Sequence, residues 1–170
     1  MHPDLARARA AIDTATEGMT EGDLLRHAPG KWSSAQVLEH LAKAYGSTAY
    51  ILDKCVREHR TVATPPLARQ RFFAWVIIGV GYFPHGRSAP SVTIPGGMSP
   101  LEALAAARTS LAALDAAAAR GVEVFGPVTR VANHPLLGGF TIPQWRRFHR
   151  VHTRHHMKQI VALRVLPRQT

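Results

Sequence analysis

The sequence predicts an all-α protein, built as one four-helix bundle over residues 1–170 with an extra short helix and long connecting loops. Two observations support this fold class. Apolar residues recur at intervals of three or four along four long segments, which is typical of amphipathic helices, and each segment opens with a helix start signal. A chain of 170 residues, 46% hydrophobic and 19% charged, is long and apolar enough to bury the core of a single domain.

The first two helices are predicted from Pro3 to Gly18 and over residues 33–59. Pro3 stands at an opening position, where its missing N–H costs little. The apolar side of the first helix comprises Leu5, Ala8, Ile12 and Ala15. The second helix opens with Ser33 and Gln36, which form a capping-box pattern.

The longest apolar run, residues 72–83, ends at Pro84 and has 12 residues, whereas a membrane-spanning helix needs about 20. We therefore expect no membrane partner, and a short helix over 67–83 that packs between two other helices. The alternatives are the wall of a substrate channel and a contact in a homodimer. The next segment, 84–98, is rich in Pro and Gly and is predicted to be a loop.

The third helix, 99–121, begins with an N-cap Ser, a Pro at the first helical position and a capping-box Glu. The fourth, 141–166, opens with another capping-box pattern, Thr-Ile-Pro-Gln. Between them lies the long connection 122–140. Long structured loops in a compact domain are usually functional, so we expect this connection and the 84–98 loop to cover one end of the bundle.

The fourth helix has four histidines within eight residues. At about 100° per residue, one face is predicted to point inward and comprises Trp145, His149, His152, His156, Gln159, Ile160 and Leu163. The opposite face comprises Arg146, Arg147, Arg150, Arg154 and Lys158. His152 and His156 are four residues apart, a spacing that lets two imidazoles converge on one metal ion. A third ligand must come from another helix.

His40 is the best candidate for this third ligand, because it shares the inward face of the second helix with Val37 and Ala44. His40 lies about two turns after its helix begins, and His152 about three turns after its own. These depths match only if both helices begin at the same end of the bundle, so we expect them to be parallel. Cys55 shares the His40 face but lies about 22 Å further along the helix, and is expected in the core.

The formal net charge is +10, from 21 Lys and Arg against 11 Asp and Glu. These basic residues are spread along the chain without a nucleic-acid-binding motif, so we expect no nucleic-acid partner. The single cysteine excludes an internal disulfide framework and a Cys-rich zinc finger, and any metal site must therefore use His and carboxylate. The amino terminus has no signal-peptide pattern, so the expected location is cytoplasmic.

Two segments resemble the paired motifs of the DinB/YfiT-like superfamily of metal-dependent enzymes: Trp32-Ser-Ser-Ala-Gln-Val-Leu-Glu-His40-Leu and His152-Thr-Arg-His-His156-Met-Lys-Gln159-Ile. Their order and separation also fit. The resemblance spans nearly the whole chain. Within the superfamily, the chain looks like a branch catalogued as a domain of unknown function, on four features: His2-Pro, Asn133-His-Pro-Leu-Leu-Gly-Gly-Phe, Trp145 and the His-rich helix.

The resemblance implies a DinB-like four-helix bundle with one divalent ion, often zinc or nickel, with iron and manganese as alternatives. Carried over to this chain, the ligands are His40, His152 and His156. Characterised relatives include thiol-dependent S-transferases and a maleylpyruvate isomerase that use bacillithiol, mycothiol or glutathione, so a low-molecular-weight thiol is an implied cofactor. Three neutral imidazoles leave open positions on the ion, as in catalytic sites, where it can activate a water or thiol and polarise a carbonyl.

We therefore expect a metal-dependent enzyme that acts on a small-molecule substrate, of the thiol S-transferase or hydrolase type. Glu39 is adjacent to His40 but points about 100° away from it, so no protein-derived general base is evident. The alternative function is a non-catalytic metal-containing bundle that serves as a sensor or binding module.

Four further residues have roles that the sequence leaves open. His149 is our candidate catalytic residue, as a pocket group or fourth ligand, and the alternative is a packed, hydrogen-bonded neighbour. His155 is expected to hydrogen-bond a ligand or another helix, and Gln159 to make a structural contact. His134 follows Asn133, which is expected to stabilise a turn, although both could reach the metal end.

A substrate pocket is predicted at the metal end of the bundle. Its expected walls are Trp32, Trp145, His149 and parts of the 84–98 and 122–140 loops, because small-ligand clefts usually present aromatic walls with a few polar groups. The alternative is that both tryptophans only pack against the helix entrances.

Overall fold

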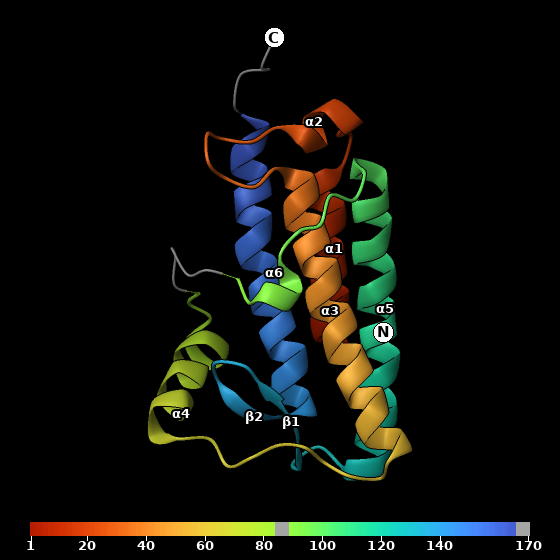
Figure 1. The fold of residues 1–170 in the computed structure, drawn as a ribbon, viewed down its shortest axis with the longest axis vertical. Coiled ribbons are helices and arrows are strands. Elements are labelled where there is room, and N and C mark those ends of the chain that lie inside the picture. The colour runs from red at the N-terminus through yellow and green to blue at the C-terminus, as the bar shows by residue number, and fades with distance from the viewer. Residues whose placement is uncertain (84–88, 166–170) are drawn as a thin grey trace.

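The computed structural model describes residues 1–83 and 89–165 and has four long helices arranged as a bundle (Figure 1). These helices are α1 (Pro3–Thr16), α3 (Ser34–Arg57), α5 (Pro100–Phe125) and α6 (Ile142–Arg164). The connecting elements are α2 (Glu21–Leu25), α4 (Ala68–Ala74), the π-helical η1 (Trp75–Val80), the 3-10 helix η2 (Ser91–Thr93), β1 (Arg130–His134) and β2 (Gly138–Thr141). The all-α fold class is confirmed.

The predicted helix starts are confirmed by their caps. Ser33 accepts from the backbone N–H of Gln36, and the Gln36 side chain accepts from the backbone N–H of Ser33; Thr141 and Gln144 make the same reciprocal pair. The predicted ends are less accurate. α5 continues to Phe125 instead of stopping at Gly121, where a Cβ would overlap Cδ1 of Ile142. Gly121 therefore allows α5 and α6 to pack closely. The predicted end of the last helix, at residue 166, lies outside the described residues.

α2 was not predicted from the sequence. Gly18, with φ of 68°, ends the first helical segment, but the chain then forms another short helix. Thr20 and Asp23 cap it reciprocally, a Thr-x-x-Asp pattern that is recognisable in the sequence. This connection lies at the end of the bundle where α3 begins (Figure 1).

The direction of the helices corrects one expectation. α3 and α5 are parallel neighbours, since Gly46 lies against Ser110 and, further along both helices, Asp53 pairs with Arg120 at 2.7 Å. In contrast, α3 begins at the end of the bundle where α6 finishes (Figure 1). The predicted parallel arrangement of α3 and α6 is therefore wrong, and these two helices are antiparallel.

The long crossover between α3 and α5 explains this direction. The chain enters α5 at the end of the bundle where α3 began, so α5 repeats the direction of α3 instead of reversing it. The β-hairpin then reverses the chain into α6. Its strands pair antiparallel, with Asn133 opposite Gly139 and His134 opposite Gly138. The hairpin was not predicted, and it lies at the start of α6.

The apolar segment of α4 and η1 packs on one side only. Ile77 and Ile78 are buried, whereas Phe72, Trp75 and Tyr82 are exposed by 58%, 61% and 55%. The segment therefore does not pack between two helices as expected, but covers one flank of α6. Within the described residues, no helix combines the length and the apolar character that crossing a membrane requires. The predicted core positions of α1 and Cys55 are buried.

Candidate metal centre

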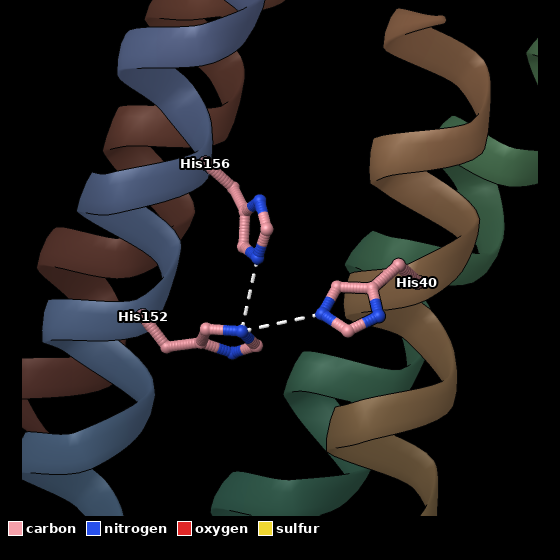
Figure 2. A group of neighbouring side chains, drawn as sticks. All are labelled: His40, His152 and His156. Carbon is pink, nitrogen blue, oxygen red and sulfur yellow. Dashed lines mark hydrogen bonds between the residues drawn. The ribbon is translucent and has the colours of Figure 1, made fainter. Parts of the chain in front are cut away.

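Three histidine rings converge between α3 and α6 (Figure 2). Nε2 of His152 lies 3.2 Å from Nε2 of His40 and 3.0 Å from Nε2 of His156. The nearest ligand atoms of all three residues lie within 4.8 Å of one another, and each residue is buried. The three residues named from the sequence as metal ligands are thus brought together.

The three histidines can meet because α3 and α6 pack antiparallel. His40 lies about two turns after α3 begins, and His156 about two turns before α6 ends. Further down, Tyr45 contacts Thr153, and Thr48 contacts His149, so the residue number rises along α3 as it falls along α6. His40 and the α6 histidines therefore lie at the same depth in the bundle, although α3 and α6 begin at opposite ends of it.

Hydrogen bonds at Nδ1 determine which ring nitrogen has a free lone pair. Nδ1 of His40 lies 3.0 Å from the carbonyl oxygen of Thr93, and Nδ1 of His156 lies 2.8 Å from Oε1 of Gln159. An oxygen of this kind can only accept, so Nδ1 bears the proton in both rings and Nε2 presents its lone pair to the centre. Outer partners of this kind are typical of histidines that bind metals.

The chemistry of the three nitrogens fits a cation. His152 has one Nε2 to share with two neighbours that both present lone pairs, and its Nδ1 is buried without a partner among the described residues. One proton on His152 can satisfy only one of those lone pairs. A divalent ion satisfies all three, and nitrogens on a tetrahedral zinc lie about 3.3 Å apart with bonds of about 2.0 Å, close to the 3.0 and 3.2 Å found.

Burial keeps the three imidazoles neutral. It lowers the pKa of His156 to about 3, and the neighbouring His40 acts in the same direction. Burial also lowers the pKa of His152 well below its usual range, helped by both neighbours. It lowers the pKa of His40 too, against the opposing effect of the hydrogen bond that His40 donates to the Thr93 carbonyl oxygen. Neutral imidazole is the form that binds metal ions, so all three rings are in the metal-binding form at neutral pH.

Three aromatic side chains border the triad, and one of them, Phe148, stacks on His152 with ring centroids 5.4 Å apart. The Trp32 ring lies 5.2 Å from the His40 ring, and Phe83 stacks on His152 with ring centroids 5.2 Å apart. Both Trp32 and Phe83 are half-buried. Trp32 was expected near the site, whereas Phe83 was missed, since its only signal is its place at the end of the apolar run.

His149 lies one turn before His152 on α6 but is not part of the triad. Its Nε2 lies 3.0 Å from Oγ1 of Thr48, and its ring stacks on Trp145 with centroids 5.8 Å apart. Burial, with a smaller contribution from His134, lowers the pKa of His149 to about 3. Its Nδ1 is buried and has no partner among the described residues. A packed neighbour and a pocket group both remain compatible with this geometry, so its catalytic role stays a prediction.

The other open residues have structural partners. Nε2 of His155 lies 3.2 Å from the side-chain amide nitrogen of Gln159 within α6. Gln159 is exposed, whereas it was predicted to face inward, and its side-chain oxygen accepts a hydrogen bond from Nδ1 of His156. Asn133 accepts from the backbone N–H of Thr64 at 3.0 Å, which ties the hairpin to the preceding crossover. The turn itself is stabilised by His134, whose Nδ1 accepts from the backbone N–H at position 136. Asn133 thus has a different role from the one predicted.

The two long connections do not cover the same end of the bundle. Thr93 of the 84–98 segment contacts the triad, whereas His134 of the hairpin packs on Trp145 near the start of α6. An open groove of about 300 Å³ lies between η1 and the hairpin, with Trp75 and Phe140 among its walls. This groove is separate from the triad. Residues 84–88 of the predicted pocket wall lie outside the described residues.

The fold and the triad together define a helical-bundle protein with a candidate three-histidine metal site between antiparallel helices. Residues 4–160 match the family model of the DinB superfamily, and the chain belongs to this family. The match covers both motif segments. No curated protein and no solved structure gives a significant match.

Proposed function

We propose that this protein is a metal-dependent enzyme acting on a small molecule, of the thiol S-transferase or hydrolase type. The observation that supports it is the convergence of three neutral Nε2 atoms, from His40, His152 and His156, at one buried point. A divalent ion, zinc or nickel first, would be held by these three residues. Such an ion is a Lewis acid with open positions, and it lowers the pKa of a coordinated water or thiol.

The chain's own groups would orient the reactants and keep bulk water away. Trp32 and Phe83 flank two of the ligands and offer apolar surface to the body of a substrate. His149 is the proposed acid–base group, because it lies on the same helix one turn away and has a buried Nδ1 without a partner among the described residues. A low-molecular-weight thiol is the proposed co-substrate.

The metal content of the purified protein and a screen of electrophiles with low-molecular-weight thiols test this function together. We expect about one equivalent of metal, and turnover that disappears on chelation. The His152→Ala variant should lose both metal and turnover, whereas His27→Ala, which removes an exposed histidine outside the long helices, should keep both. Full metal content in the triple alanine variant of the triad would contradict the metal site.

The second candidate function is a non-catalytic metal-containing bundle that senses or binds a ligand. One observation favours it: the Glu39 carboxylate, adjacent to a ligand in sequence, accepts from the backbone N–H groups of Gly97 and Met98 and is not available as a base. In that case metal removal should lower the melting temperature, and no electrophile or ester should be turned over. Metal-dependent turnover of any small molecule would exclude this alternative.

We also propose a homodimer, formed through the exposed side of α4 and η1. Phe72, Trp75 and Tyr82 provide its apolar contact surface. Light scattering should give a mass of twice 18.6 kDa for the wild type, and a smaller mass for Trp75→Ser. A monomer mass for the wild type at micromolar concentration would contradict the dimer.

A further inference from the structure

A buried carboxylate lies directly beside the metal ligand His40. Glu39 is 2% exposed, and its side chain reaches away from the triad to the backbone of the segment that follows η2. Oε1 accepts from the N–H of Gly96 at 2.5 Å, and Oε2 accepts from the N–H groups of Gly97 and Met98 at 3.0 Å each. One carboxylate therefore holds three successive backbone amides.

Lys43 extends this clamp by one helical turn. Its Nζ lies 2.9 Å from Oε1 of Glu39 and donates to the carbonyl oxygen of Ile94 at 2.8 Å. Both side chains project from α3 and bind the same short stretch, residues 94–98: Lys43 binds its first residue, and Glu39 binds residues 96–98. The stretch contains Gly97 with φ of 97°, so the backbone itself is permissive and needs external contacts to stay in one conformation.

The carboxylate is ionised in this setting. Burial raises the pKa of Glu39, but the hydrogen bonds from Lys43 and from the three backbone amides outweigh burial, and the pKa falls to about 2. A buried carboxylate with charge-assisted hydrogen bonds on both oxygens is a strong anchor, since removing it takes the partner from three backbone N–H groups and from Lys43 at once.

The anchored stretch leads directly to the partner of His40. Thr93 is the last residue of η2, next to Ile94, and its carbonyl oxygen lies 3.0 Å from Nδ1 of His40. Thr93 is itself held by its hydroxyl, which donates to the carbonyl oxygen of Pro90 at 2.9 Å. The path therefore runs from Glu39, through residues 93–98, back to the ring of the adjacent residue His40.

We propose that Glu39 is a positioning residue of the metal centre: by clamping residues 94–98 it places the Thr93 carbonyl so that His40 is protonated at Nδ1 and presents Nε2 to the triad. Lys43 assists by holding the start of the same stretch at Ile94. The consequence for metal affinity rests on the proposed function, whereas the consequence for the His40 ring is a property of the metal-free protein.

The His40 tautomer tests the clamp without any metal. Nitrogen-15 spectra of the histidine side chains should show wild-type His40 protonated at Nδ1. Glu39→Gln cannot accept from all of these donors, and we expect a mixture of His40 tautomers in it. Asp53→Asn, which removes a carboxylate from the same helix far from the triad and breaks the pair with Arg120, should keep the wild-type tautomer. An unchanged His40 signal in Glu39→Gln would overturn the proposal.

Metal affinity provides the second measurement. Loss of an outer hydrogen-bonding partner typically weakens metal binding by about 10- to 100-fold, and we expect a loss of this size for zinc in Glu39→Gln, with partial recovery in Glu39→Asp. Lys43→Met, at a partly exposed position where folding is not at risk, should give a smaller loss. Wild-type affinity in Glu39→Gln and Lys43→Met would refute the clamp, whereas absence of zinc binding in the wild type would refute the proposed function instead.

Discussion

His40 and His152 are 112 residues apart in the sequence, yet their Nε2 atoms lie 3.2 Å apart across the contact between α3 and α6. This pair joins the helix before the long crossover to the helix after the hairpin. An ion bound between them would link the two halves of the bundle, and its removal would lower the free energy of unfolding of the whole domain.

The first prediction is that zinc or nickel raises the melting temperature of the metal-free protein. A ligand at 100 times its dissociation constant stabilises the folded state by about 2.7 kcal/mol, which corresponds to a shift of about 5 to 10 °C for a domain of this size. Calorimetry with and without chelator measures it. His156→Ala should abolish the shift and His27→Ala should preserve it; an equal shift in both variants would mean that the metal binds elsewhere.

The ligand set could be predicted from the sequence because the spacing of His152 and His156 fixes them on one helical face, and the apolar periodicity around His40 fixes its inward direction. The helix starts were equally accessible, since a capping box is a local pattern. In each case the information lies within a few consecutive residues, and burial of the apolar face reinforces the local preference.

Features that depend on distant contacts could not be predicted. The antiparallel arrangement of α3 and α6 follows from the long crossover, and no local sequence pattern indicates to which end of the bundle the crossover returns the chain. The hairpin has strands of only five and four residues, without an Asn-Gly or Asp-Gly turn. Glu39 was correctly placed on a different face from His40, but its backbone partners lie 57 to 59 residues away, so its role could not be predicted from the sequence.

The second prediction separates a catalytic from a packing role for His149. If it is the acid–base group, His149→Gln should retain the metal and lose about 100-fold or more in turnover. Thr48→Val removes the partner of Nε2 while leaving the imidazole in place, and should retain most of the turnover. Metal content and activity are measured on the same preparations. Unchanged turnover in His149→Gln would remove this residue from the site.

The third prediction is that the metal-free protein loses stability as the pH falls below about 6.5. An unfolded histidine takes up a proton near that pH, whereas burial lowers the pKa of His149 to about 3 and that of His134 to about 4. Between these values only the unfolded state binds the extra protons, so the free energy of unfolding decreases as the pH falls.

Thermal denaturation between pH 7 and 5 isolates this effect from the buried Glu39, whose pKa is lowered to about 2 and whose contribution is lost only below about pH 4.5. His149→Gln should show a shallower fall in melting temperature than the wild type. A melting temperature that is constant from pH 7 to 5 would show that the buried histidines are not neutral in the folded protein.

The last prediction concerns the contact between the hairpin and the crossover. A Cβ at Gly139 would lie 2.6 Å from the carbonyl oxygen of Thr64 and 3.1 Å from Cβ of Ala63, and backbone cannot move aside as a flexible side chain can. We expect Gly139→Ala to destabilise the protein by about 1 to 3 kcal/mol.

Gly46→Ala is the matched control: it lies inside α3 with its nearest neighbour at 3.8 Å, and should stabilise by up to about 1 kcal/mol. Urea denaturation compares the two variants. Zinc affinity should be unchanged in Gly139→Ala because the hairpin lies away from the triad, and a wild-type free energy of unfolding in this variant would contradict the packing of the hairpin against residues 63–64.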